Sequence, residues 1–314
     1  MQKIKYIIKR IITMLITLLV VSFFLFLALH LAGQDPLGVI IGEKQNISEE
    51  AREAIRRQFY LDRPIVEQYF IWLSSALKGD FGIDYIQKVP VNSLIGGRAA
   101  VTVGMVVFSM LFSVIIAIPL GIVSAIKKNT VVDSIISFTM LVLTSTPGFL
   151  VAMVMLVLLS KYIPGYQSIG SYESVSELIQ RIMGPAICLA FGNVALIGRV
   201  TRNAMIEQLN GDYIVTCKAK GISYSRIILK HALKNSIIPV FTITSMLVGI
   251  MVGASVLVEQ IFSLPGLGGL LSAACLKNNY PVIMALTLIL LIIFQLVNLI
   301  SDIAYTIIDP RIKL

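Results

Sequence analysis

Six long apolar stretches dominate the sequence and leave few folds open to the chain. They cover residues 11–32, 101–126, 134–160, 184–200, 237–258 and 281–305. A helix rises about 1.5 Å per residue, so about 20 apolar residues cross the roughly 30 Å hydrocarbon core of a bilayer. The sequence therefore predicts an all-α polytopic membrane protein with six transmembrane helices, surrounded by a lipid bilayer. The third helix is expected to kink at Thr144-Ser145-Thr146-Pro147-Gly148.

The composition agrees with this prediction. The chain is 57% hydrophobic and 14% charged, whereas soluble domains are about 45–50% apolar and about 25% charged. The net charge of +9 lies in patches between the apolar stretches, which favours a role in membrane orientation over binding to nucleic acid. The first apolar stretch is longer than the ~7–15-residue apolar centre of a cleaved signal peptide, so we expect it to be retained as a span.

The distribution of basic residues predicts the orientation. The two short segments assigned to the outside carry only Lys161, Arg181 and Lys277. The short segments assigned to the inside are much more basic; they carry Lys3, Lys5, Lys9, Arg10, Lys127, Lys128, Arg199, Arg202, Lys218, Lys220, Arg226, Lys230, Lys234, Arg311 and Lys313. Because basic residues are retained in the cytoplasm, we expect both termini to be cytoplasmic.

Residues 34–98 form a long polar insert with nearly balanced charge. Ser48 followed by Glu49 and Glu50 is typical of a capped helix start, and this helix is expected to reach about Tyr60. Pro64 then excludes helix from the residue before it, and a second helix is expected over 65–77. The insert is predicted to be a small extracytoplasmic cap, with a disordered loop as the alternative.

Residues 212–240 form a basic element, here called the coupling element. It is rich in lysine and arginine and holds one acid, Asp212. Gly221 interrupts its helical pattern, and glycine in a helix costs about 1 kcal/mol relative to alanine, so two short helices at an angle are expected. Such a bent, half-apolar, basic projection suits a socket on a soluble partner. The alternative is a juxtamembrane loop that only sets topology.

Several polar residues lie within the apolar stretches. Asn193, Gln295 and Asn298 are candidates for lining a pathway between the helices, because polar groups inside a membrane are costly and often functional. The alternative is that they form hydrogen bonds between helices. Glu259, at the outer end of the fifth stretch, is expected to be hydrated. Residues 264–269 are expected to form either a re-entrant gate or a plain loop.

Catalytic motifs are absent from the sequence. No GxxxxGK[ST] pattern is present, so the chain has no phosphate-binding loop of its own. Three cysteines and two histidines follow no metal-ligand spacing. We therefore expect no catalytic residue, no cofactor and no metal site, and thus no enzyme.

The motifs of the coupling element resemble those of one transporter family. They are Asp212-Tyr213, Lys218-Ala219-Lys220-Gly221-Ile222-Ser223, His231-Ala232-Leu233-Lys234-Asn235 and Ile238-Pro239. The chain resembles the permease subunits of ATP-binding-cassette (ABC) importers of the peptide/nickel type, the dipeptide/oligopeptide permease B-type family. In this family the element is the "EAA" loop, but Val215-Thr216-Cys217 stands where Glu-Ala-Ala is usual. Outside the element, Leu61-Asp62-Arg63-Pro64 and Gly79-Asp80-Phe81-Gly82 also match, whereas Tyr60 stands where glycine is usual.

The resemblance implies a type I ABC importer permease fold in a bacterial or archaeal cytoplasmic membrane. Residues 1–33 would form the amino-terminal tail and first span, 34–98 the insert, and 99–314 the permease core with five spans and the coupling element. The residues implied to couple to the ATPase are Asp212, Tyr213, Lys218, Ala219, Lys220, Gly221, Ser223, Arg226 and His231.

The implied partners are a second homologous permease subunit, two ATP-binding-cassette ATPase subunits and an extracytoplasmic solute-binding protein. The implied function is ATP-driven import of di- and oligopeptides, with nickel or metallophore import as the alternative within the family. Rival classes are an ion-coupled secondary transporter and a membrane scaffold or sensor. Against the secondary transporter, the sequence shows no evident internal repeat.

Overall fold

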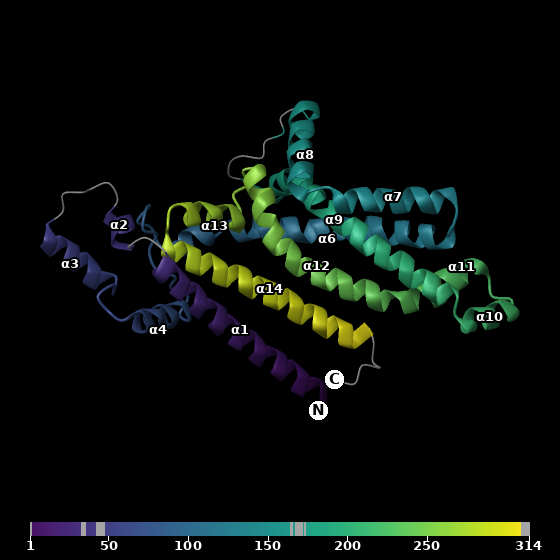
Figure 1. Cartoon of the computed structure of the whole chain (residues 1–314), viewed down its shortest axis with the longest axis horizontal. Helices are drawn as coiled ribbons and strands as arrows, with labels where there is room; N and C mark the ends of the chain where they lie inside the picture. Colours follow the sequence, from purple (N-terminus) through teal and green to yellow (C-terminus); the bar gives the residue numbers. More distant parts are fainter. Residues whose placement is uncertain are drawn as a thin grey trace. The chain divides into compact units, whose positions relative to one another are not determined.

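The computed structural model describes residues 2–32, 36–41, 48–163, 166, 172 and 174–308. Apart from an isolated β-bridge between Ile83 and Pro90, the regular structure of these residues is helical (Figure 1). The elements are α1 (Gln2–Ala32), α2 (Pro36–Ile41), α3 (Glu49–Gln58), α4 (Ile65–Ala76), α5 (Val91–Ile95), α6 (Arg98–Ile126), α7 (Val131–Ser145), α8 (Gly148–Tyr162), α9 (Val175–Leu209), α10 (Asp212–Ala219), α11 (Tyr224–Arg226), the π-helix η1 (Ile227–Ala232), α12 (Leu233–Ile261), α13 (Leu267–Leu276) and α14 (Tyr280–Ile308). The predicted all-α class is confirmed. The carboxy-terminal tail over 309–314, and parts of the insert and of the predicted outer loop over 161–183, lie outside the described residues.

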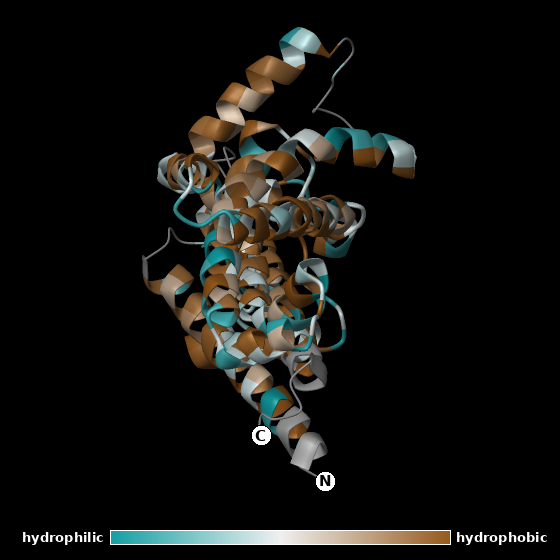
Figure 2. Ribbon diagram, turned by 90° about the vertical axis from the view of Figure 1, so that its right-hand side faces the viewer, coloured by the Kyte–Doolittle hydropathy of each residue, from teal (hydrophilic) through white to brown (hydrophobic). Residues whose placement is uncertain are grey.

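Within the described residues, five helical segments are long and apolar enough to cross a membrane. They are Ile8–Leu31, Val91–Ile126, Val175–Leu209, Tyr224–Ile261 and Tyr280–Ser301. Helices α7 and α8 make a sixth span if the bent pair is counted as one. Apolar residues, brown in Figure 2, predominate along the long helices. Many of them are exposed, including Phe138 and Ile115, as expected of surfaces that face lipid or another subunit and not water.

The third span is broken where the kink was predicted. Helix α7 ends at Ser145 and α8 begins at Gly148 with Pro147 as its N-cap. The two helices meet at an angle of 98°, and α8 stands steeply away from α7 in Figure 1. Proline at 147 excludes helical geometry from Thr146, whose ψ of 123° is extended.

Two predicted loops are shorter than the sequence suggested. Helix α9 begins at Val175, so residues 175–183 are helical and not part of the outer loop. Ser174 caps this helix, because its Oγ accepts the Glu177 N–H at 3.2 Å. In the other loop, helix α13 begins at Leu267, so residues 267–269 belong to a short apolar helix.

The described chain divides into two compact units. One comprises Met1–Thr102 with Pro265–Gln295, and the other Val103–Leu264 with Leu296–Leu314. In the first unit, α1 and α4 meet at Phe26 and Tyr69, and the Ser22 and Tyr69 hydroxyls lie 2.9 Å apart. The predicted helices of the insert are present: Ser48 Oγ caps α3 by accepting the Ala51 N–H at 3.3 Å, and α4 follows Pro64.

The second unit is built around α9, against which α6, α7, α8 and α12 pack. Helices α6 and α9 cross closely at Gly121, where an added Cβ would lie 2.6 Å from the Gly198 carbonyl oxygen and from Thr201 Cβ. Glu259 corrects the sequence-based expectation. Its side chain is fully buried near the end of α12 and is not exposed to solvent as expected.

Candidate functional site

The break at Gly221 closes helix α10 with a Schellman turn. The Gly221 N–H donates to the Lys218 carbonyl at 2.9 Å, and the Ile222 N–H donates to the Cys217 carbonyl at 3.2 Å. These two bonds pair carbonyls that the end of a helix leaves without partners. The turn requires the left-handed region, and Gly221 has φ +71°. The expected bend in the coupling element is therefore present.

The second half of the coupling element differs from the prediction. Instead of a separate short helix, α11 continues through the six-residue π-helix η1 into α12, and Tyr224–Ile261 forms one span-length helical segment. No glycine lies between Tyr224 and Ile238, and membrane helices tolerate proline, so Pro239 does not end the helix. Movement of α11 would thus act directly on the fifth span.

The coupling element has a buried side and an exposed side. Ile214, Ile227 and Ile228 are buried and anchor it. Between the basic residues of the exposed side, Val215 (67% exposed), Tyr224 (52%) and Leu229 (63%) present apolar side chains. A patch of positive charge with large exposed apolar residues is typical of a protein-binding surface.

The structure brings most of the predicted coupling residues onto this exposed side. Tyr213 and His231 differ, because both are half-buried, and the Tyr213 hydroxyl lies 2.9 Å from Gln208 Oε1. The exposed members are Asp212, Lys218, Ala219, Lys220, Gly221, Ser223 and Arg226. Asp212 occupies the first turn of α10, where a negative charge stabilises the helix dipole.

Buried residues hold the coupling element against the membrane helices. Ala125 from α6, Met205 from α9, and Ile228 and Ala232 from η1 form one apolar cluster. The turn between α6 and α7 lies at the same end of this unit as α10 and α11 (Figure 1). This end of the unit therefore supports the coupling element through the cluster of Ala125, Met205, Ile228 and Ala232, and is here called its mount.

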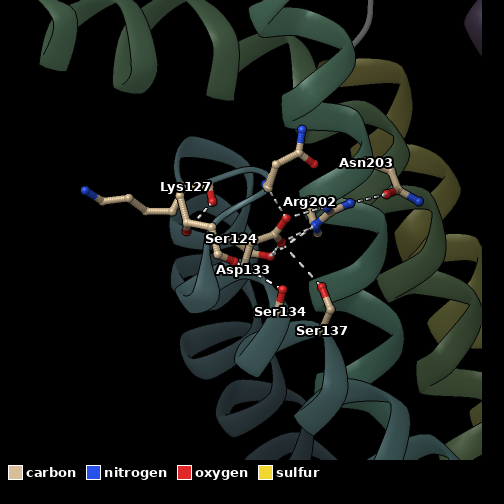
Figure 3. A network of polar contacts seen from close by, with 9 residues as sticks. Ser124, Lys127, Asp133, Ser134, Ser137, Arg202 and Asn203 are labelled. Carbon is tan, nitrogen blue, oxygen red and sulfur yellow. Dashed lines mark hydrogen bonds and ion pairs between the residues drawn. The ribbon is translucent and has the colours of Figure 1, made fainter.

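A buried ion pair lies in the same unit, between α7 and α9 (Figure 3). Arg202 Nε and Nη2 donate to the two carboxylate oxygens of Asp133, each at 2.7 Å. Ser124 Oγ donates to Asp133 at 2.5 Å, and the Asn129 N–H donates at 3.0 Å. Asp133 is 5% exposed. A bidentate pair with further donors offsets the cost of burying the charge, so the network joins α6, α7 and α9.

Sequence reasoning did not identify Asp133. It lies just before the predicted third span, so its neighbours in sequence marked it as a loop residue. Its partner Arg202 was assigned to the basic inner segment. A single acid directly before a long uncharged run, with an arginine at the end of another span, is a signal that could have suggested the pair.

The three candidate pathway residues lie on two helices. Asn193, on α9, is 9% exposed and donates from Nδ2 to the Leu189 carbonyl of its own helix at 2.9 Å. Gln295 and Asn298 lie on α14 and are half-buried. Since they are three residues apart, they lie on the same side of that helix.

These features define a class of membrane protein. A bundle of membrane-spanning helices carries an exposed basic element at one end, and this element continues into a span. Such an arrangement is suited to transmitting movement across a membrane.

Comparison with known families gives the same class. Residues 117–314 match the family described as the binding-protein-dependent transport system inner membrane component. Residues 3–106 match the amino-terminal family of such membrane components. The chain therefore belongs to the inner membrane components of binding-protein-dependent transport systems. It is a multi-pass inner membrane protein and the permease subunit of an ABC importer, not an enzyme.

Curated relatives resemble the chain along nearly its whole length. A peptide permease protein of Brucella suis is 34% identical over 99% of both chains. The oligopeptide transport system permease AppB of Bacillus subtilis is 35% identical, with 98% of this chain and 99% of AppB covered. The glutathione transport system permease GsiC of Escherichia coli is 32% identical over 99% of both.

A solved structure supports the fold. A chain of the inward-facing MetNI methionine ABC transporter superposes with a TM-score of 0.58 and 18% identity. The match covers 69% of this chain and 96% of that one. The predicted permease fold is therefore confirmed.

Proposed function

We propose that this permease moves short peptides inward and that its coupling element receives force from separate ATPase subunits. The observation that carries the proposal is the exposed turn between α10 and α11. This turn has no side chain at Gly221, and the helix that follows it continues through η1 into α12. A Cβ at Gly221 would meet nothing within 4 Å. A partner surface can therefore approach the backbone at this turn.

The mechanism follows from the continuity of the helices. When ATP closes a pair of ATPase subunits, the socket on each would displace α10 and α11. Since α11 and η1 lead directly into α12, the displacement would move the fifth span. The buried pair between Asp133 and Arg202 would make α7 and α9 respond together. Two permease subunits would then rock from inward-facing to outward-facing as rigid bodies.

The charges of the coupling element would mainly set how the element is oriented in the ATPase socket, and would add less to the binding affinity. Lys218, Lys220 and Arg226 are exposed, so they would meet acidic or polar rims of the socket. Charge complementarity of this kind mainly guides association and orientation. The exposed apolar residues Val215, Tyr224 and Leu229 would supply the buried contact area.

The names of the relatives favour peptides as the substrate class. Relatives at similar identity are named as a peptide permease, an oligopeptide permease and a glutathione permease, and glutathione is itself a tripeptide. Nickel or metallophore import remains the alternative within the peptide/nickel type. The binding protein outside the membrane would make most of the selection.

Reconstitution tests the proposal. The permease, its homologous partner subunit and the ATPase subunits are purified together and placed in vesicles with the solute-binding protein. We expect uptake of labelled di- or tripeptides that requires ATP, the binding protein and all membrane subunits. Uptake of nickel or a nickel chelate alone would contradict the peptide assignment. Peptide uptake that persists without ATP but stops with a proton ionophore would support a secondary transporter.

A separate experiment tests on which side of the membrane the coupling element lies. The exposed residue Lys220 is replaced by cysteine in a variant in which Cys188, Cys217 and Cys275 are serine. A membrane-impermeant maleimide should label it in inside-out vesicles and not in right-side-out vesicles. The opposite result would place the coupling element outside and refute both the ATPase role and the cytoplasmic assignment of the termini.

A further inference from the structure

A cavity of about 440 Å³ lies beside the break in the third span. Its walls come from α7, α8, α9 and α12, and all of them belong to one compact unit. The volume falls in the ~300–1,000 Å³ range of small-molecule sites. The lining is largely apolar, including Phe149, Leu196 and Met251, and the described lining residues carry no charged side chain.

The first turn of α8 lies at the wall of this cavity. Gly148 and Phe149 line it, and within the described chain neither N–H donates a hydrogen bond. The N-cap is Pro147, which offers no capping side chain. The start of a helix carries a partial positive charge, so this turn offers two donors and a favourable potential to an oxygen atom.

Asn193 of α9 supplies an acceptor to the same cavity. Its Nδ2 is occupied by the Leu189 carbonyl, while its Oδ1 accepts no hydrogen bond from the described residues. The residue lines the cavity and is 9% exposed. An oxygen without a protein partner in an apolar wall loses its hydration when a solute fills the cavity, so this oxygen favours a ligand that carries an N–H group.

We propose that this cavity is a contact site for the peptide during its passage through the permease. A carboxylate or carbonyl oxygen of the peptide would accept from the Gly148 and Phe149 N–H groups, and a peptide N–H would donate to Asn193 Oδ1. The apolar walls would take a side chain. The inference rests on the proposed function, because it assumes that peptides are the transported solute.

The chemistry of the lining favours a peptide over other solutes. Two donors and one acceptor match the polar groups of a peptide unit. Besides Asn193, the polar side chains of the described lining are those of Cys188, Thr144 and Thr146. Both threonine hydroxyls already donate to carbonyls of α7 at 2.8 Å. Such a lining, without carboxylate or imidazole, does not resemble the oxygen and nitrogen ligand sets that proteins offer to divalent metal ions.

Two glycines provide a matched pair of variants. Gly192 lines the cavity and Gly253 does not. Both lie within helices and are exposed, and an added Cβ would meet nothing within 4 Å at either one. The substitution Gly192→Leu fills the cavity, whereas Gly253→Leu adds the same side chain elsewhere. Leucine favours helix more than glycine, so neither change weakens its helix.

Uptake is measured in the reconstituted importer with the binding protein saturated by peptide. We expect Gly192→Leu to lower uptake at least about tenfold by steric exclusion, with Gly253→Leu within about twofold of the wild type. ATPase stimulation by the loaded binding protein should persist in both variants. Equal uptake by the two variants would overturn the proposal. Failure of the wild-type importer to move peptides would instead refute the proposed function.

A second variant tests the acceptor without filling the cavity. Asn193→Leu removes Oδ1 at similar size, and loss of one hydrogen bond should weaken apparent peptide affinity by about two- to tenfold. Peptides N-methylated at the contacting amide should lose this difference between wild type and variant. An unchanged apparent affinity for the unmodified peptide would overturn the role of Asn193.

Photolabelling tests occupancy directly. A dipeptide bearing a benzophenone side chain is irradiated with the whole importer, and the labelled permease residues are mapped. We expect label on the cavity walls, reduced by excess unlabelled peptide and by Gly192→Leu. Label confined to other segments would overturn the proposal. So would loss of copurification with the second permease subunit in Gly192→Leu, since the cavity would then be filled by that subunit.

Discussion

Helices α3 and α10 end in the same kind of turn, but the residue in the left-handed position is a tyrosine after α3 and a glycine after α10. After α3, the Tyr60 N–H donates to the Arg57 carbonyl at 3.2 Å and the Leu61 N–H to the Arg56 carbonyl at 2.8 Å. This is the Schellman pattern found after α10 around Gly221. Tyr60 has φ +57° and Gly221 φ +71°. The left-handed region costs a residue with a Cβ roughly 1–2 kcal/mol, so the tyrosine is strained where the glycine is not.

The difference shows that the turn itself does not demand glycine. Ser263 and Asn278 close α12 and α13 with the same pair of bonds, at φ +51° and +52°. At Tyr60 the ring packs below the Arg63 guanidinium, 5.4 Å from the ring centroid, and this contact offsets part of the strain. At Gly221 no neighbour lies where a side chain would project. We therefore infer that glycine at 221 serves to keep the surface bare for a partner.

The largest expected effect concerns the mount on which the Gly221 turn rests. Arg202→Ala leaves the Asp133 carboxylate buried without its charged partner, which should lower the free energy of unfolding by about 3 kcal/mol. The measurement is the apparent melting temperature of the purified importer. Such a loss would show that the ion pair stabilises the unit that carries the Gly221 turn, whereas the turn at Tyr60 has a local contact with Arg63.

The control removes both charges. The double variant Asp133→Asn with Arg202→Leu leaves no unpaired ion, so most of the stability should return. If Arg202→Ala alone melted like the wild type, the ion pair would not be part of the mount.

The second effect tests the bare surface itself. Gly221→Trp should lower ATP-driven uptake by about tenfold or more, because a bulky side chain clashes with any partner that approaches the turn. Insertion into the membrane should be unchanged, since the turn is exposed. Uptake and ATP hydrolysis are measured together, and hydrolysis that continues without uptake is the expected sign of uncoupling. Wild-type uptake in this variant would refute the assignment of the coupling element.

Many of the helix starts and breaks could be predicted from the local sequence. The helix start at Ser48, the break at Pro64 and the bend at Gly221 each depend on one residue and its immediate neighbours. The broken third span followed from Pro147 in the same way. The extension of α9 back to Val175 was also readable, because Ser174 and Glu177 have the spacing of a capping box.

Other features depend on contacts that the sequence does not display. Asp133 and Arg202 are 69 residues apart, and only the packing of α7 on α9 brings them together. The burial of Glu259 likewise depends on neighbouring helices. The cavity beside Asn193 forms only where three spans pack together and the third span bends at its break. The local pattern identified Arg202, Glu259 and Asn193 as polar or charged but not their surroundings, and it did not identify Asp133.

A smaller effect is expected when the strained residue is relaxed. Tyr60→Gly removes the left-handed strain, but it also loses the contact with Arg63 and adds freedom to the unfolded chain. These terms oppose each other, so the stability should change by less than about 1 kcal/mol. Thermal melting of the importer is the measurement. A large destabilisation would mean that the tyrosine ring, and not the turn, holds this end of α3.

The smallest effect separates backbone strain from bulk at the coupling element. Gly221→Asn keeps a residue type that tolerates the left-handed region and adds a short polar side chain. If the bare surface matters only to large side chains, uptake should stay within about twofold of the wild type. Gly221→Val makes the matched comparison, because a β-branched residue of similar size is strained at positive φ. If the asparagine variant lost as much uptake as Gly221→Trp, then any side chain at this position would block the partner, and the socket would have to contact the Gly221 backbone directly. If the valine and tryptophan variants failed equally while asparagine did not, the strain of the turn would explain the glycine, and the contrast with Tyr60 would lose its functional meaning.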